Sequence, residues 1–320
     1  MKLATPNGLI RTVNDNFATL AFNFPVDPLY VDPGVSASGN GLSWENAFKT
    51  MTEALAAVQT GGTIFFRGDV REECEGSNLV FDVSIIGVGG LHHPDLPAAG
   101  YDPGAACWRA PATPTTATPL IEVRGRGWQF HNIMFDCPVD AAAIKFVNNG
   151  GSGEDEYDAS HAIVSGCVFQ QGKYAIQLDG PIGHVMIWDN DFAILSETGG
   201  CGIYAATDGG PHYRWKIERN YFVAAATAEG NKGNQSHIDC ALFSSLIAKN
   251  FFGTVEGTGK YVDLTGGQDN IVVDNHMMGS YSTDDYVSGT GDDWIGNRSI
   301  DLAETEVDTT TGWTIAVPAA

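Results

Sequence analysis

A six-residue pattern recurs through the second half of the chain: an aliphatic residue, two further residues, asparagine, one residue, and then phenylalanine or methionine. The clearest copies are Ile187 to Phe192, Ile217 to Phe222, Ile247 to Phe252 and Val272 to Met277, and their asparagines, continued by Asn297, lie 22 to 30 residues apart. Repeats of this length are stacked units that cannot bury their apolar faces alone. The chain is therefore predicted to form a solenoid.

The repeating segments are predicted to be strands. They alternate with a period of two, are rich in valine, isoleucine and aromatic residues, and are interrupted by glycine and asparagine, whereas helical repeats need longer segments with a period of 3.6. Looser copies of the pattern are Val164 to Phe169 with Cys167 in place of asparagine, Asn132 with Met134, and Trp294 with Asn297.

Within each coil, the residue three before asparagine and the residue two after it are predicted to face inward. The asparagine is expected at a corner, with a left-handed backbone and with its amide bonded to the next asparagine. Because coils stack about 4.8 Å apart, this gives a ladder. Its members would be Asn190, Asn220, Asn250, Asn275 and Asn297.

The six cysteines, Cys74, Cys107, Cys137, Cys167, Cys201 and Cys240, are 30 to 39 residues apart, close to one per coil. A chain of 320 residues buries a large core without disulfides. They are predicted to be buried free thiols stacked along the solenoid. Their spacing matches no zinc motif.

Acidic residues outnumber basic residues by 39 to 17, which gives a net charge of −22. Such a charge repels nucleic acids and anionic membranes, so neither is expected as a partner. No apolar stretch approaches the roughly 18 residues of a membrane span. The first ten residues lack the continuous hydrophobic region of a secretory signal, so the protein is expected to stay in the cytosol or to leave it by assembly and lysis.

Four regions are predicted along the chain: an attachment arm (1–30), an entry segment with a capping helix (31–62), the coils (63–300) and a tail (301–320). In the helix, Ser43 is the predicted N-cap and Gly61-Gly62 the stop, with an apolar stripe formed by Ala47, Met51, Ala54, Leu55 and Val58. A helix here would cover the open end of the solenoid and prevent edge-to-edge association. Residues 89–119 and 149–160 are predicted loop excursions.

The entry segment also carries a family resemblance. Tyr30-Val-Asp-Pro, Gly41-Leu-Ser, Ala47-Phe-Lys-Thr and Gly61-Gly-Thr-Ile precede the Asn-x-Phe coils. In this order the chain resembles right-handed parallel β-helix proteins of the pectate-lyase-like group, over about residues 30–300. The resemblance implies an all-β fold, a single-stranded right-handed parallel β-helix with an N-terminal capping helix. The group includes polysaccharide lyases and hydrolases as well as bacteriophage tailspikes and other virion proteins, so it leaves function open.

The catalytic motifs of the group are largely missing. Members that hydrolyse polygalacturonate carry Asn-Thr-Asp, Asp-Asp, His-Gly and Arg-Ile-Lys, and this chain has only the paired acids, as Asp284-Asp285 and Asp292-Asp293. Pectate lyases place calcium-binding acids beside a basic residue, because a proton alpha to the uronate must be removed. The candidates for such a set are Asp189, Asp191, Glu218 and Arg219. The alternative is a surface ion-pair ladder, which Asp189, Arg219, Lys249 and Asp274 would continue.

Two further sets are binding candidates. Glu154, Asp155, Glu156 and Asp158 offer carboxylates to Ca²⁺, with a solvated loop as the alternative. Trp188, Tyr204, Tyr213 and Tyr221 offer aromatic platforms for sugar rings, whereas Trp215 has inward parity and is expected in the core.

Two functions are therefore considered. The first is a structural or binding protein of a virus (phage) particle: a β-helical spike or capsid decoration protein, homotrimeric, attached to other virion proteins through its N-terminal arm and contacting host glycans. The second is a lyase or glycoside hydrolase acting on acidic polysaccharide. No cofactor is expected apart from Ca²⁺ at the acidic loop.

Overall fold

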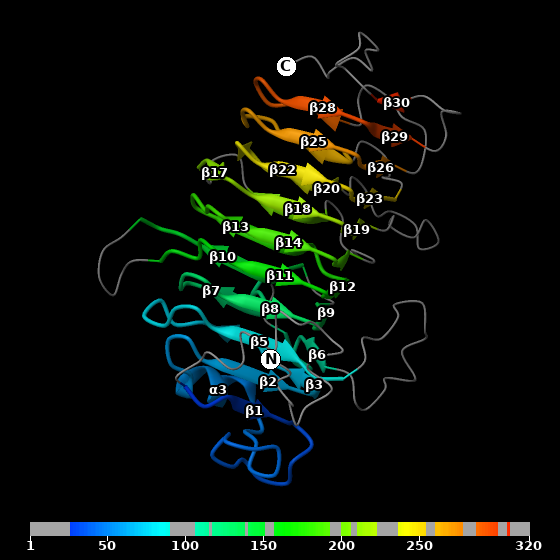
Figure 1. Cartoon of the computed structure of the whole chain (residues 1–320). Helices are drawn as coiled ribbons and strands as arrows, with labels where there is room; N and C mark the ends of the chain where they lie inside the picture. Colours follow the sequence, from blue (N-terminus) through cyan, green and yellow to red (C-terminus); the bar gives the residue numbers. More distant parts are fainter. Residues whose placement is uncertain are drawn as a thin grey trace, which may run out of the picture.

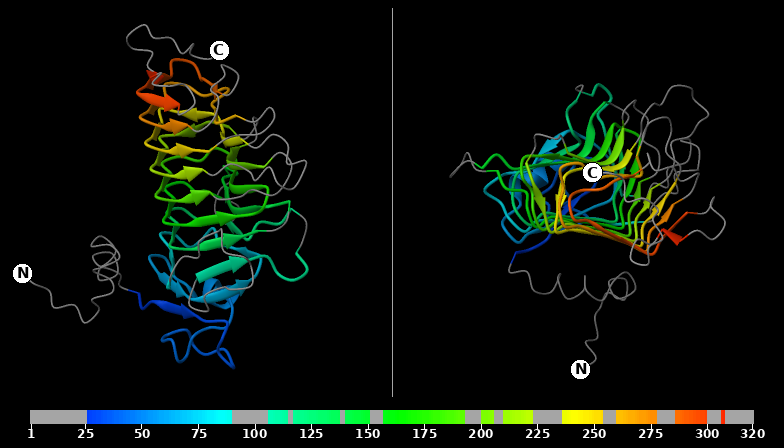
Figure 2. Two further views of the ribbon diagram at one scale, coloured as in Figure 1. Left: turned by 90° about the vertical axis from the view of Figure 1, so that its right-hand side faces the viewer. Right: turned by 90° about the horizontal axis from the view of Figure 1, so that it is seen from above.

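Three parallel sheets, here called A, B and C, wind into one stack of coils (Figure 1). The computed structural model describes residues 26–89, 106–114, 117–137, 140–150, 157–192, 200–205, 210–222, 236–253, 260–277, 286–299 and 306–307. The chain passes from sheet A to sheet B to sheet C and back to A in a right-handed sense, and the view along the axis shows the three sheets around a common interior (Figure 2). The predicted right-handed parallel β-helix is confirmed.

Sheet A contains β1 (Leu29–Val31), β2 (Thr63–Phe66), β5 (Ser84–Gly87), β8 (Gln129–His131), β11 (Ile163–Ser165), β14 (Met186–Trp188), β18 (Lys216–Glu218), β22 (Leu246–Ala248), β25 (Ile271–Val273) and β28 (Asp293–Ile295). Because β1 pairs in parallel with β2, sheet A begins within the segment assigned to the arm, before the predicted start of the coils at residue 63.

Sheet B contains β3 (Gly68–Arg71), β6 (Ala106–Arg109), β9 (Met134–Asp136), β12 (Val168–Gln170), β15 (Asp191–Phe192), β19 (Tyr221–Phe222), β23 (Phe251–Phe252), β26 (His276–Met277), β29 (Asn297–Ser299) and the antiparallel β30 (Glu306–Val307). Sheet C contains β4 (Cys74–Glu75), β7 (Ile121–Val123), β10 (Ala142–Val147), β13 (Tyr174–Asp179), β16 (Cys201–Ala205), β20 (Ser236–Asp239), β24 (Val262–Asp263) and β27 (Tyr286–Val287). A small parallel pair, β17 (His212–Tyr213) and β21 (Leu242–Phe243), lies between sheets C and A.

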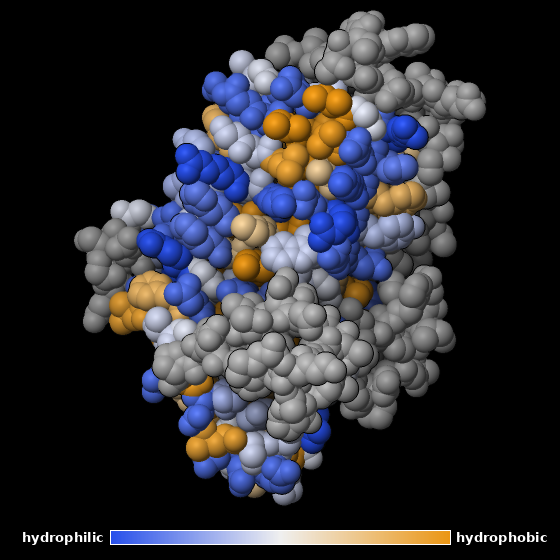
Figure 3. Space-filling model, viewed as in Figure 1, coloured by the Kyte–Doolittle hydropathy of each residue, from blue (hydrophilic) through white to orange (hydrophobic). Residues whose placement is uncertain are grey.

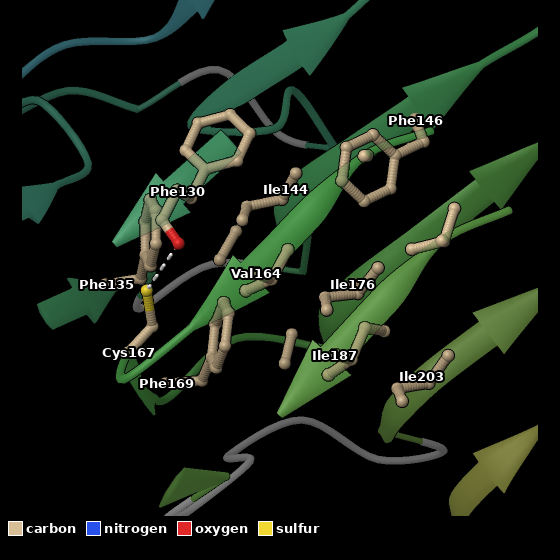
Figure 4. Packing of buried hydrophobic residues seen from close by; sticks show 14 of the residues in the cluster. Phe130, Phe135, Ile144, Phe146, Val164, Cys167, Phe169, Ile176, Ile187 and Ile203 are labelled. Carbon is tan, nitrogen blue, oxygen red and sulfur yellow. Dashed lines mark hydrogen bonds between the residues drawn. The ribbon is translucent and has the colours of Figure 1, made fainter. Parts of the chain in front are cut away.

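The interior consists of side chains stacked in rows, as the alternation predicts. In sheet A, Ile187, Ile217, Ile247 and Val272 are register partners and are fully buried. In sheet B, Phe135, Phe169, Phe192, Phe222 and Phe252 stack with ring centroids 4.3–5.2 Å apart. Figure 4 shows the isoleucines of sheet C meeting these rows, with the Cys167 thiol donating to the carbonyl of Phe130. Trp215 is in the core, as predicted.

The capping helix α3 (Met51–Ala57) begins later than predicted. Its N-cap is Thr50, which forms a reciprocal capping box with Glu53. Ser43 is not the N-cap, because Phe48 pairs with β1: its amide donates to the carbonyl of Tyr30, and this extended backbone cannot be helical. The helix buries Met51 and Ala54 in the core and ends at Val58, before the predicted glycine stop.

Part of the predicted excursion at 89–119 is a strand. Ala106–Arg109 forms β6 between β3 and β9, because Trp108 fills the core between Phe66 and Phe135. The strand was not predicted, because the sequence around it is rich in proline and alanine, which are uncommon in strands. Residues 90–105 lie outside the described residues.

The cysteines are free, and five of them are buried, with Cys74 partly exposed. The predicted stacking is wrong, because they occupy different positions in their coils. Cys107 has Asp69 and Met134 as register partners, and Cys201 has Tyr174 and Ser236.

Candidate functional site

The asparagine ladder closes the corner between sheets A and B. Each side-chain amide donates to the carbonyl oxygen of the next asparagine side chain at 2.8–3.0 Å, from Asn190 through Asn220, Asn250 and Asn275 to Asn297. The same carboxamide oxygens accept from the backbone N–H of the preceding member, and the N–H of Cys167 begins the series. All five asparagines are buried, so their role is structural.

The left-handed backbone lies one residue earlier than predicted. The residues with positive φ are Asp189, Arg219, Lys249 and Asp274, each directly before a ladder asparagine. Asn132 also has positive φ, so Ile133 takes the ladder position in that coil and the copy read from Asn132 and Met134 was out of register by one residue.

Of the four predicted catalytic residues, three meet around Arg219 and the fourth, Asp191, lies on another face. Asp189 and Arg219 form a two-pronged ion pair at 2.8 and 3.0 Å, with both side chains about half exposed. Glu218 pairs with Lys216 at 2.9 Å on the outer face of sheet A, next to its register partner Trp188. These contacts match the ion-pair alternative, and such exposed pairs contribute little to stability.

Asp191 lies on the outer face of sheet B. Its register partner is Tyr221, whose ring stacks on Phe251 with centroids 4.6 Å apart. The guanidinium of Arg219 also lies 3.7 Å from Glu218, so Asp189, Glu218 and Arg219 meet at the corner. The corner separates Asp191 and Tyr221 from them, so the predicted set is not brought together as a whole. Tyr213, on β17, and Tyr204, in sheet C, lie elsewhere again.

The predicted calcium set cannot be assembled from the described residues. Glu154, Asp155 and Glu156 lie outside them. Asp158 accepts from Arg126 at 2.7 Å and from the Ser160 backbone, and these bonds lower the pKa of its carboxyl despite partial burial. The described part of the chain holds no cluster of three or more metal-ligating side chains, and none of its helices is long and apolar enough to cross a bilayer.

The outer face of sheet C brings together residues that sequence reasoning left apart. One outward row runs over successive coils through Glu122, Lys145, Gln177, Tyr204, Asp239 and Asp263. At its N-terminal end the row is an ion-pair network, because Lys145 contacts Glu122 at 3.7 Å and Asp179 at 2.8 Å.

The row contains Tyr204, which stacks on Tyr174, a residue of β13 outside the row whose register partners are Ala142 and Cys201. The rings of Tyr174 and Tyr204 are parallel within 5° with centroids 4.3 Å apart, and both side chains are partly exposed. Burial, followed by the neighbouring Tyr204, raises the pKa of Tyr174 well above its ordinary value. Both an apolar ring surface and a protonated hydroxyl are therefore presented on this face.

Beside the tyrosines, two carboxylates occupy adjacent strands. Asp239 and Asp263 are register partners, and burial together with the charge of Asp263 raises the pKa of Asp239 to about 6. Asp263 accepts from the hydroxyl and the amide of Thr265. Asp239 is thus protonated at a higher pH than an ordinary carboxyl, with a second carboxyl on the adjacent strand.

A sequence signal for this row exists but was missed. Its members directly follow the buried aliphatic residue of the third strand in each coil, as Gln177 follows Ile176, Tyr204 follows Ile203 and Asp239 follows Ile238. Only the parallel register shows that they are neighbours.

The outer face of sheet A differs in character. Figure 3 shows an apolar cluster on its upper part, where Leu246, Ile271, Val273 and Ile295 point outward from β22, β25 and β28. Ile271 is 45% exposed.

No protein-family model and no curated protein matches the sequence. Among solved structures, Escherichia coli ybhc is 11% identical over 87% of this chain and 86% of that chain, with a TM-score of 0.49. An alginate lyase from Paenibacillus sp. str. FPU-7 is 13% identical, with coverage of 78% and 92% and a TM-score of 0.47. The Dettilon tailspike protein is 12% identical, with coverage of 85% and 58% and a TM-score of 0.37.

The fold is a parallel β-helix, as the three stacked parallel sheets of this chain show. At these identities the likeness concerns the fold alone, and a parallel β-helix carries unrelated activities. The function of this parallel β-helix has to be argued from its own side chains.

Proposed function

We propose that the protein binds a glycan along the outer face of sheet C. The observation that carries the proposal is the stacked pair Tyr174–Tyr204, because Tyr204 lies in the outward row between Gln177 and Asp239. Sugar rings pack on aromatic faces through their C–H groups, while carboxamide and carboxylate groups accept from their hydroxyls. Because the row extends over successive coils, it suits a chain-like ligand.

The test is glycan-array screening followed by calorimetry with Tyr204→Ala. Loss of one ring from the stack should weaken binding about 5- to 30-fold, corresponding to about 1–2 kcal/mol. Tyr221→Ala is the matched control, because Tyr221 also stacks on a neighbouring aromatic ring but lies on sheet B. Equal losses in both variants, or none in either, would contradict a site on sheet C.

We also propose the biological setting: a β-helical spike or capsid decoration protein of a virus particle, homotrimeric, with residues 1–30 contacting other virion proteins. The support is the arm ahead of a solenoid and the absence from the sequence of the hydrolase motifs of the group. Light scattering should give three times the 34.1 kDa chain mass, and deletion of residues 1–25 should abolish incorporation into particles. A monomeric protein that is not incorporated into virus particles would contradict this setting.

Cleavage of a polysaccharide is a second candidate, and the Asp239–Asp263 pair favours it. A carboxylic acid with its pKa near 6 beside a carboxylate is the combination that glycoside hydrolysis uses. If the protein cleaves, Asp239→Asn should lower the rate about 100-fold or more, measured as new reducing ends. Absorbance of unsaturated uronates would instead indicate a lyase. Asp189→Asn should leave the rate unchanged, since Asp189 pairs with Arg219 at the far corner.

A further inference from the structure

A second corner of the coil, between sheets C and A, carries an exposed row of cationic side chains. His161, His184 and Arg214 each lie two residues before register partners in β11, β14 and β18, so they stack on successive coils. All three have positive φ and are exposed. Their amides donate to the carbonyl of the preceding residue in the next coil, His161 to Gly183, His184 to Tyr213 and Arg214 to Phe243, at 2.8–2.9 Å.

Arg214 stands out because no carboxylate among the residues that the structure describes forms an ion pair with it. Within the described ranges, the other arginines except Arg298 each form an ion pair with an acid: Arg67, Arg71, Arg109, Arg124, Arg126 and Arg219. In a chain with a net charge of −22, a guanidinium that no described acid approaches is available to an external anion.

The two histidines extend this surface. Their rings are parallel within 10°, with centroids 4.7 Å apart. Partial desolvation, His161 and Arg214 lower the pKa of His184. Parallel rings send their nitrogen lone pairs in parallel directions, which does not suit chelation of one metal ion. An anion bound beside the row would instead offset the repulsion among its members.

The other charged groups on these and the adjacent coils are largely neutralised. Arg126 forms an ion pair with Asp158, which lies three residues before His161 in the chain. Lys216, two residues after Arg214, forms an ion pair with Glu218. The next residues of the corner row are Ser244 and Asp269, and the preceding ones are Gly127 and Asp82. On either side, the first acid of the row is therefore two coils away from the three residues.

An aromatic ring borders the row. Tyr213 is 47% exposed, and one side of its ring meets Phe243 at 5.3 Å. In the preceding coil the equivalent position is Gly183, which has no side chain to cover the other side. Tyr213 directly precedes Arg214 in the chain, and its carbonyl accepts from the amide of His184, so it belongs to the same corner, at the edge of the stack where β17 is labelled in Figure 1.

We propose that this corner binds an anionic sugar, with the sugar ring on Tyr213 and its carboxylate or sulfate on Arg214 and His184. His161 would meet a second anionic group one coil away, so an oligosaccharide with repeated charges fits better than a single sugar. This surface is separate from the row on sheet C and does not depend on it.

The test is calorimetric titration of the full chain with polygalacturonate oligomers, sulfated galactan oligomers and an uncharged galactan, at pH 5.5 and pH 8. Arg214→Asn is the informative variant, because asparagine tolerates positive φ and the variant should fold. The expected result is at least tenfold weaker binding of an anionic oligomer. Arg298→Asn, which removes an arginine on sheet B, away from this corner, should bind normally.

Binding should also be tighter at pH 5.5 than at pH 8, because imidazole gains positive charge as the pH falls, and Tyr213→Ala should weaken it. The polymer that binds identifies the anionic group as carboxylate or sulfate. The proposal is overturned if neither anionic oligomer binds, if the uncharged galactan binds equally well, or if Arg214→Asn has no effect. An affinity that does not change with pH would remove the histidines from the site. Tyr204→Ala should leave this binding intact, which separates the corner from sheet C.

Discussion

Single residues with a left-handed backbone turn the chain at two corners of each coil. At the first corner they are Asp189, Arg219, Lys249 and Asp274, and at the second they include His161, His184 and Arg214. Such a backbone costs an L-residue about 1–2 kcal/mol, which the ladder of backbone and asparagine hydrogen bonds offsets. The side chains at these positions are exposed. Packing in the core therefore does not restrict which residue types occupy the two corners.

Asn250→Ala should destabilise the protein strongly. Asn250 is 1% exposed, and its amide joins Asn220, Asn275 and the carbonyl of Ile217. Removing it leaves several buried polar groups without partners, at a cost of about 2–4 kcal/mol in the free energy of unfolding. Chemical denaturation measures this, with the exposed neighbour in Lys249→Ala as the control, expected within about 0.5 kcal/mol. Equal effects of the two changes would contradict the ladder.

Asp239 should make stability depend on pH. Its folded pKa of about 6 lies above the ordinary value of 3.8, so the folded state holds this proton more tightly and loses stability as pH rises between them. Asp239→Asn should therefore gain about 1–2 kcal/mol relative to the unmodified chain at pH 8 and nothing at pH 4, allowing for partial exposure. Asp263→Asn should lower the pKa of Asp239 in an NMR titration. A pH-independent difference would show that Asp239 is ionised throughout.

At the scale of elements, helix α3 is fastened to the first coil by an acid from the following strands. Glu72 accepts from the amides of Met51 and Thr52 at 2.8 and 3.0 Å and from the hydroxyl of Thr52 at 2.6 Å. These are the free N–H groups of the first helical turn, where a negative charge is favourable. The helix is thus capped both by its own Thr50 and by the solenoid that it covers.

Glu72→Ala should loosen this attachment. We expect a loss of about 1–2 kcal/mol and faster amide hydrogen exchange over Met51–Ala57, measured by mass spectrometry, while sheet A keeps its protection. Glu45→Ala, which removes an exposed acid from the entry segment, should leave the exchange of the helix unchanged. If the helix exchanges at its original rate in Glu72→Ala, the capping box alone holds it.

At the scale of the whole molecule, the three sheets share an apolar interior, whereas the residue types on their exterior faces differ from sheet to sheet. The interior is a continuous aliphatic and aromatic core, whereas outside, sheet C carries the tyrosine and carboxylate row and sheet A an apolar cluster. Because the chain has a net charge of −22, its exterior also repels itself.

Salt should therefore stabilise the molecule. Raising NaCl from about 0.01 M to 0.1 M shortens the screening length from about 30 Å to 10 Å, which weakens repulsion over the whole surface while surface ion pairs lose little. We expect the melting temperature to rise by a few degrees, measured by calorimetry, with sucrose-matched viscosity as the control. A falling melting temperature would mean that the ion-pair networks outweigh the net charge.

The sequence by itself determined the solenoid, its inward rows and the asparagine ladder. The period-two alternation and the corner asparagine are local patterns, and they recur in the sequence of successive coils. It misplaced the N-cap of α3, the positive φ residues, β6 and the stacking of the cysteines, which depend on partners distant in the chain, such as β1 for Phe48. Only the tertiary structure decided which outward side chains meet. Coil lengths vary, so the register that sets Tyr204 beside Asp239 and Asp239 beside Asp263 exists only once the coils have stacked.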